Sequence, residues 1–72
     1  MLSVWTVYDH PKDFPHNYVA RRFEISGGKP RVTDDFIVCP DVDAIRRIML
    51  DNGLYRFERS EGDDSKIIES WM

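Results

Sequence analysis

The sequence predicts an α+β fold, a small antiparallel β-sheet with one α-helix packed on one face, in the order β-β-β-α-β-β. Five short stretches are rich in β-branched and aromatic residues, one stretch has apolar residues at helical spacing, and turn signals separate them. A single helix over one face of an antiparallel sheet is the simplest way to bury the apolar stripe of that helix. With 72 residues, the chain is expected to form a single α+β domain over residues 1–72.

The first three strands are expected at residues 2–8, 17–25 and 32–39, where β-forming residues alternate with polar ones. The first of these strands would carry apolar side chains on both faces, which indicates an interior strand or a strand with one face covered by a partner. Between the second and third strands, Gly27 and Gly28 are adjacent, and glycine reaches positive φ at little cost. The two glycines therefore predict a tight turn.

The helix is marked by capping signals at both of its ends. Pro40 blocks continuation of the third strand, and Asp41 is a favourable N-cap residue. Gly53 suits the left-handed position that follows the end of a helix. Between these signals an apolar stripe recurs at helical spacing, formed by Val42, Ile45, Ile48 and Met49.

Two further strands are expected at residues 54–59 and 66–72, joined into a hairpin by an acidic turn. Strict alternation would place Ile67 and Trp71 on the same face of the last strand. The single helix covers only one face of the sheet. The other face, expected to carry aromatic residues such as Trp5, would then be partly exposed, and exposed apolar patches mark interaction sites.

The stretch between the first two strands, residues 8–18, contains both histidines and two of the four prolines. Pro11 and Pro15 fix their own φ and restrict the preceding residue, so neither a helix nor a regular central strand continues through this stretch. A stiff loop is predicted, with Phe14 packed back onto the core. Such a loop suits recognition and structural closure alike.

Cysteine usage and the N-terminal residues indicate a cytoplasmic protein. Cys39 is the single cysteine, so the chain forms no internal disulfide, which fits a reducing compartment. The first ten residues lack the basic and apolar regions of a signal peptide. No apolar run approaches the roughly 20 residues that a membrane-spanning helix needs.

The net charge of −3 is unevenly distributed along the chain. Residues 1–31 carry five basic and three acidic side chains, whereas residues 32–72 carry five basic and ten acidic ones. Neither half is basic enough to indicate general nucleic-acid binding. A local site is an alternative hypothesis, because basic side chains near Tyr18 and Phe23 could bind a single strand by charge and stacking. The basic residues of that hypothesis are Arg21, Arg22, Lys29 and Arg31. The competing interpretation is a charged sheet face whose aromatic rings point inward.

Four loop residues are of types that bind metal ions, namely Asp9, His10, Asp13 and His16. Two histidines separated by five residues match no standard zinc pattern. The aspartates also suit turn initiation, so the sequence predicts neither a metal site nor a cofactor, and metal binding by the two histidines stays open. The acidic turn with Glu61, Asp63 and Asp64 lacks the spacing of a calcium-binding EF-hand loop.

Cys39 is the one thiol available for nucleophilic catalysis. It lies beside Pro40 at a strand end, where a small buried hydrophobic residue is expected. No known nucleophile signature surrounds it. No catalytic residue and no enzymatic activity are therefore predicted.

Three parts of the chain look like a group of short, uncharacterised bacterial proteins: the opening VWTVYDHPKDFPHNYVARRFEI, the Gly-Gly-Lys-Pro turn and the closing GLYRFERSEGDDSKIIESWM. Members of that group similarly open on a WTVYDHP-like run, continue with a YVARRFE-like run and end near a penultimate Trp. These three parts make up about two-thirds of the chain. It implies a small bacterial protein, complete at this length, with no known activity, ligand or catalytic residue.

These observations favour a small interaction module that binds a protein partner or forms a homodimer. The motivating feature is a larger number of bulky apolar residues than one helix can cover. A nucleic-acid-binding accessory protein is the alternative. The candidate interaction surface comprises Asp9, His10, Asp13, His16, Arg21 and Arg22.

Overall fold

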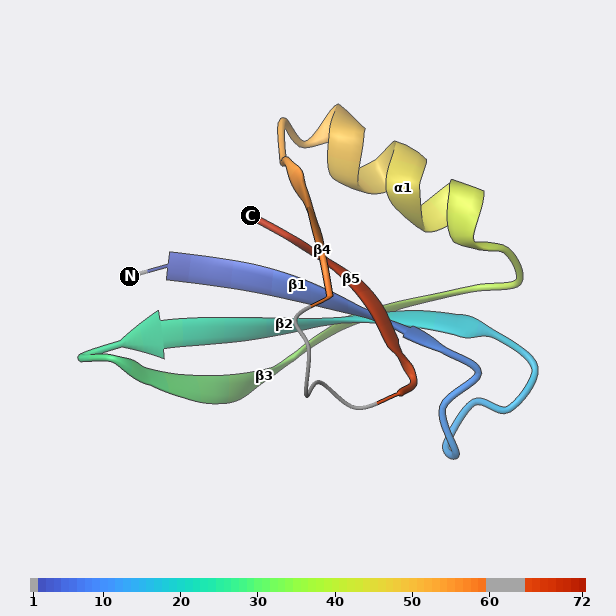
Figure 1. The fold of residues 1–72 in the computed structure, drawn as a ribbon, viewed down its shortest axis with the longest axis horizontal. Coiled ribbons are helices and arrows are strands. Elements are labelled where there is room, and N and C mark those ends of the chain that lie inside the picture. The colour runs from blue at the N-terminus through green and yellow to red at the C-terminus, as the bar shows by residue number, and fades with distance from the viewer. Residues whose placement is uncertain (1, 60–64) are drawn as a thin grey trace.

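A computed structural model of the chain describes residues 2–59 and 65–72, and it confirms the predicted fold class (Figure 1). One five-stranded antiparallel sheet has the strand order β3-β2-β1-β5-β4, and one helix packs against it. The elements are β1 (Leu2–Asp9), β2 (Tyr18–Ser26), β3 (Lys29–Cys39), α1 (Val42–Asp51), β4 (Arg56–Glu58) and β5 (Ile67–Trp71). Within the described residues, no helix is both long enough and apolar enough to cross a membrane.

Both predicted helix caps are confirmed. The Asp41 side chain accepts a hydrogen bond from the backbone N–H of Ala44 at 2.9 Å, which satisfies one of the free donors in the first turn. At the other end Gly53 has a φ of 74° and donates to the Leu50 carbonyl at 2.9 Å. Leu54 then donates to the Met49 carbonyl at 3.1 Å, which completes a Schellman motif.

The helix packs on the face of the sheet that carries Val7 and Ala20, which lie opposite each other on β1 and β2. Ile45 and Met49 of α1 complete this core together with Trp71 of β5. Figure 1 shows α1 on one side of the sheet only. We call this side the helix face and the opposite side the open face.

The expectation that Trp5 lies on the open face is wrong. Trp5 pairs with Trp71 across β1 and β5, and both pack in the core under α1. Alternation along a strand separates two sets of side chains, but it does not say which set the helix covers. The indole of Trp5 is a large apolar ring, and packing against the core under the helix removes part of it from water.

The face assignment of the last strand is also wrong. The register between β1 and β5 shifts between Val7 and Tyr8, so that Ile67 lies opposite Tyr8 and Glu69 opposite Val7. An extra residue in one strand reverses the alternation beyond it. Ile67 therefore lies on the open face, whereas Ile68 packs against the helix-face core together with Trp71.

The β2–β3 hairpin is longer than predicted, because β3 begins at Lys29 instead of residue 32. Gly27 and Gly28 both have positive φ, 60° and 77°, which lets Ser26 pair directly with Lys29 across a two-residue turn. Further along, the register shifts between Arg21 and Phe23. The strand β4 is shorter than predicted and spans Arg56–Glu58.

Candidate interaction surface

The open face presents apolar side chains in rows that cross neighbouring strands. One row places Leu2 of β1 opposite Ile25 of β2, which in turn lies opposite Pro30 of β3. The next row contains Val4, Phe23 and Val32 in the same order. Side chains opposite each other on paired strands lie within contact distance. The rows therefore form one continuous apolar surface.

A third row crosses all five strands and has a polar centre between two aromatic ends. Thr6 of β1 lies opposite Arg21 on one side and Ser70 of β5 on the other. The row ends at Phe36 on β3 and at Phe57 on β4, both of which are exposed. The apolar surface thus reaches both edges of the sheet.

Most exposed large hydrophobic side chains of the described residues gather on this face. Six of the seven lie on it by strand register, and the seventh, Leu50, lies on α1. The six are Leu2, Val32, Phe36, Val38, Tyr55 and Phe57. Scattered exposed hydrophobic residues are normal on a protein surface, but a contiguous set of this size marks an interaction site.

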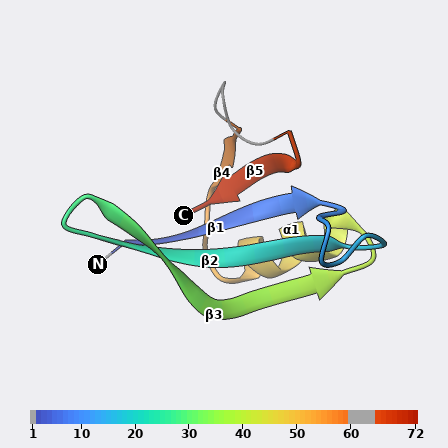
Figure 2. The same cartoon turned by 90° about the horizontal axis from the view of Figure 1, so that it is seen from below.

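The loop of residues 10–17 covers one end of the open face. It leaves the sheet on the side opposite α1 (Figure 1), and Figure 2 shows it at the end of the sheet where β1 ends and β2 begins. Phe14 packs on Phe36 with ring centroids 5.9 Å apart, and Val19 beneath this end is fully buried although it is not part of the helix-face core. Phe14 thus packs back onto the sheet, as expected, and does so on the open face.

The loop is closed by backbone hydrogen bonds. His10 donates to the Asn17 carbonyl at 3.0 Å, and Phe14 donates to the Pro11 carbonyl at 3.0 Å. His10 adopts a φ of 49°, a left-handed conformation that is uncommon outside glycine. Pro11 and Pro15 further restrict the backbone of this segment, so the loop has a fixed conformation over one end of the open face.

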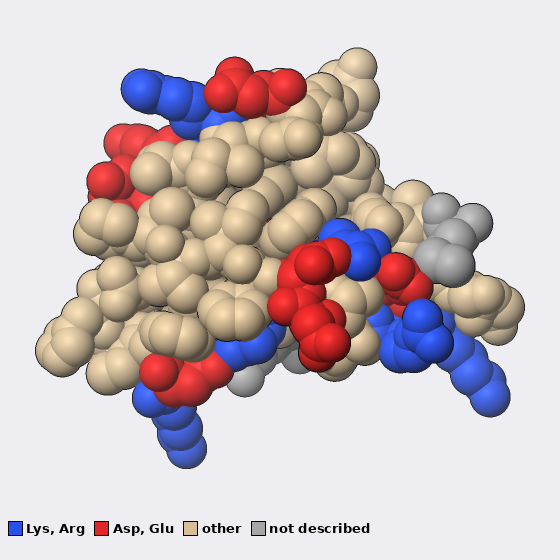
Figure 3. Space-filling view, turned by 180° about the vertical axis from the view of Figure 1, so that it is seen from behind, with Lys and Arg blue, Asp and Glu red and all other residues tan. Residues whose placement is uncertain are grey.

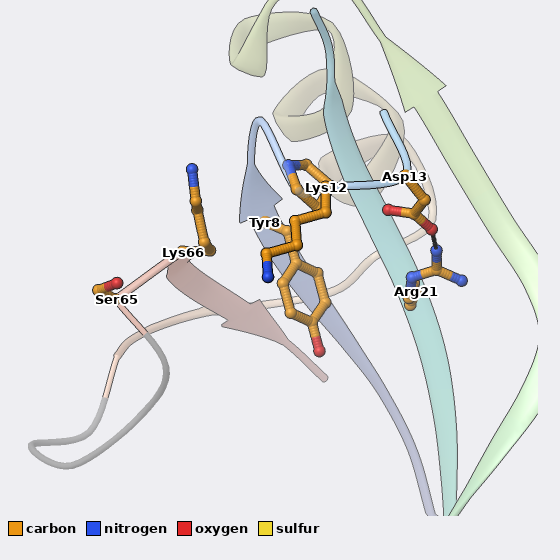
Figure 4. Close-up of a pocket in the computed structure, with 7 residues that line it drawn as sticks. Tyr8, Lys12, Asp13, Arg21, Ser65 and Lys66 are labelled. Atoms are coloured by element: carbon orange, nitrogen blue, oxygen red, sulfur yellow. Dashed lines mark hydrogen bonds and ion pairs between the residues drawn. The ribbon is translucent and has the colours of Figure 1, made fainter. Parts of the chain in front are cut away.

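Arg21 is the charged residue within the three rows, and the loop neutralises it. Its guanidinium forms an ion pair with Asp13 and lies 5.6 Å from the centroid of the Phe36 ring. Figure 4 shows Arg21 and Asp13 in contact beside Tyr8 and Lys12, at a hollow of about 600 Å³. Its described lining is Tyr8, Pro11, Lys12, Asp13, Arg21, Ser65 and Lys66.

The six residues of the predicted surface do not lie together. The side chains of Asp9 and His10 are hydrogen-bonded to each other, and the His10 and Tyr18 rings pack edge to face with their centroids 5.0 Å apart. Asp13 and Arg21 form their pair on the open face. His16 is exposed in the loop. Arg22 follows Arg21 along β2 and therefore points to the helix face.

Arg22 belongs to a network of charged residues on the helix face, beyond the area that the helix covers. It donates to Asp35 at 2.7 Å and to Glu24 at 3.1 Å, while Arg31 donates to Glu24 at 3.1 Å. The pKa of Glu24 lies below its ordinary value because its carboxylate accepts these hydrogen bonds. The hydrogen bond from Arg22 has the largest effect, and that from Arg31 the next largest. In Figure 3 acidic and basic side chains likewise lie next to one another around a broad area without charged residues.

Cys39 lies on the helix face and is half-buried against the core. Burial raises the pKa of its thiol, and the nearby Asp41 carboxylate raises it further. A thiol with a raised pKa is a poor nucleophile at neutral pH. In the part of the chain that the structure describes, no three His, Cys, Asp or Glu residues come together as metal ligands. The acidic turn proposed above falls largely on residues 60–64, outside the described ranges.

Glu69 is a structurally important residue that the sequence reasoning missed. It is 2% exposed and accepts hydrogen bonds from Arg46 of α1 at 2.8 Å and from the Trp71 indole at 2.7 Å. The hydrogen bond to Glu69 raises the pKa of Arg46. A single carboxylate within the apolar run Ile67–Trp71 was the available signal, because a buried carboxylate requires partners.

No family model, curated protein or solved structure matches the chain.

Proposed function

We propose that the chain is a non-enzymatic protein-interaction module of the bacterial cytoplasm, and that its open face is the contact surface. The observation that carries this proposal is the gathering of six exposed large hydrophobic side chains on one face of the sheet. Exposed apolar area of this extent is unfavourable in water, and burial against another protein removes it. The resemblance to short bacterial proteins and the single, half-buried thiol are consistent with the compartment.

The proposal gives nucleic acid no role. Arg21 and Arg22 lie on opposite faces of β2, so they cannot form one basic patch. Each of them is engaged by a carboxylate, Arg21 by Asp13 and Arg22 by Asp35. Binding of a single strand would need cations that face the strand together with stacking aromatic rings. A labelled oligonucleotide is therefore expected to show no mobility shift with this protein, even at low salt.

A matched pair of variants tests the proposal in a lysate of the source organism after nuclease treatment. Val32 on the open face is 64% exposed and Leu50 on α1 is 63% exposed, so lysine at either position leaves the monomer fold undisturbed. We expect saturable capture of a protein by the wild type and by Leu50→Lys, and loss of capture by Val32→Lys. Equal capture by all three proteins, or capture by none of them of either a lysate protein or a second, differently tagged copy of this chain, would contradict the proposal.

A further inference from the structure

We infer that the partner of the open face is a second copy of this chain, with the two open faces packed against each other about a two-fold axis. This inference rests on the proposed function and names the occupant of its surface. A two-fold interface uses the same patch on both copies, so residue i of one copy meets residue j of the other and the reverse. The patch must therefore be compatible with itself in charge, in area and in shape.

The charge of the open face meets this requirement. Within the three paired rows of described residues, Arg21 is the charged side chain, and Asp13 neutralises it. Two copies of these rows therefore approach each other without like-charge repulsion. A strongly acidic or basic partner would gain nothing from such a face. Thr6 and Ser70 at the centre of the third row supply hydroxyl groups that both donate and accept hydrogen bonds.

The exposed apolar area also fits a dimer. Phe36, Phe57 and Tyr55 are 49%, 47% and 75% exposed, which leaves about 340 Å² at roughly 200 Å² for each aromatic side chain. Of the exposed aliphatic residues, Leu2 and Val32 lie away from the loop end and add about 110 Å², at roughly 100 Å² for each full side chain. Apolar atoms make up about 65% of a homodimer interface, so this area corresponds to about 700 Å² per partner. Stable interfaces bury about 800 Å² per partner.

The loop determines where the second copy lies. Residues 10–17 already cover the end of the face above Val19, and Phe14 is fixed there by Phe36. Two stacked sheets need a separation of about 10 Å, which leaves no room for the loop between them. The second sheet therefore lies over the three rows that contain Leu2, Val4 and Thr6, away from the loop end that Figure 2 shows. The two loops would flank the dimer instead of entering it.

Sedimentation equilibrium of the full chain across micromolar concentrations tests this inference. The expected result is a species of twice the 8.5 kDa chain mass that dissociates on dilution. Val32→Lys should weaken the dimer at least tenfold, because each copy would place an unpaired charge in an apolar interface. Leu50→Lys, which changes an equally exposed residue on α1, should leave the dissociation constant within twofold of the wild-type value.

Three outcomes would overturn the inference, and they separate it from the proposed function. A dimer that resists Val32→Lys, or one that Leu50→Lys weakens equally, would place the two-fold contact elsewhere on the molecule. A wild-type chain that stays monomeric throughout would exclude the second copy as occupant. In that last case the proposed function is judged separately, by whether a different protein is captured from lysate in a Val32-dependent manner.

Discussion

The two faces of the sheet are built from the same strands, yet their coverings differ. On the helix face, α1 buries Val7, Ala20 and Trp71 under Ile45 and Met49. On the open face, the loop of residues 10–17 covers only the end above Val19. The helix α1 packs a continuous apolar stripe onto the sheet, whereas the short loop contributes one aromatic ring, that of Phe14. The folding of one chain thus supplies a full covering for one face only, and on our proposal association covers the other.

The two faces also differ in their charged residues. On the helix face they are bound in networks, with Glu69 held by Arg46 and Trp71, and Arg22 held by Asp35 and Glu24. On the open face the three rows contain one charge, Arg21, which the loop neutralises. A charged group that is removed from water stabilises a fold only when it has a partner of opposite charge and its hydrogen bonds are made. The three rows of the open face contain few charged groups that need partners, and the face is therefore suited to burial against another protein.

The largest expected effect on stability comes from truncating a buried side chain in the helix-face core. Ile45 is fully buried between α1 and the sheet, so Ile45→Ala should lower the free energy of unfolding by about 3 kcal/mol through lost transfer energy and a residual cavity. Urea denaturation measures this loss. Leu50→Ala, on the exposed side of the same helix, should change the value by less than about 0.5 kcal/mol. Equal losses for the two variants would mean that the helix does not form the core.

Removing the charge of Glu69 should have the next largest effect. Glu69→Gln leaves the Arg46 guanidinium without its carboxylate, at a site where Glu69 is 2% exposed. Breaking a fully buried ion pair costs about 3–5 kcal/mol, and because Arg46 is partly exposed we expect about 2 kcal/mol. The change is measured by urea denaturation against Glu58→Gln, an exposed glutamate on the neighbouring strand. If both variants are equally stable, Glu69 does not tie α1 to the sheet.

A smaller effect is expected from the loop that covers the open face. Phe14→Ala removes the ring that contacts Phe36 and should reduce the free energy of unfolding by about 1 kcal/mol. His16→Ala, an exposed change in the same loop, is the control and should have no measurable effect. Amide hydrogen exchange should become faster at Val19 in the Phe14 variant. Unchanged exchange at Val19 would show that the loop does not protect this end of the face.

The smallest effect concerns acid stability. The pKa of Glu24 is lowered in the folded state, so its charged form stabilises the fold above its unfolded value of 4.5, and that contribution is lost as the pH falls through the lower folded value. Glu24→Gln should therefore show a smaller decrease in urea midpoint than the wild type when the pH is lowered from neutral to below 4.5. A decrease equal to that of the wild type would show that the ion pairs of Glu24 do not contribute to stability.

Local signals in the sequence were sufficient to predict the helix, its caps and the Gly27-Gly28 turn, because these depend on neighbouring residues. The sequence did not show which set of alternating side chains α1 would cover, so Trp5 was placed on the wrong face. The bulge opposite Val7 and Tyr8 had no local marker either, and it reversed the positions of Ile67 and Ile68. Both errors concern relations between distant segments.

The six surface residues proposed from the sequence are divided between different parts of the structure. Asp13 and Arg21 do meet on the open face, but the other residues of the prediction lie elsewhere, because residues that are adjacent along a strand point to opposite sides. The prediction also rested on polar residues of the loop. The face itself is made of apolar residues from separate strands, and strand order determines their proximity. An excess of bulky apolar residues was the one sequence signal that pointed to it.

The central claim is that the open face, and not the helix face, meets a second copy of the chain. Isotope-filtered nuclear Overhauser spectroscopy on a mixture of labelled and unlabelled chains tests it most directly. We expect intermolecular contacts from the methyl groups of Leu2 and Val32 and from the Phe57 ring, with none from α1. Intermolecular contacts confined to α1, or their absence at concentrations where the protein sediments as a dimer, would contradict the claim.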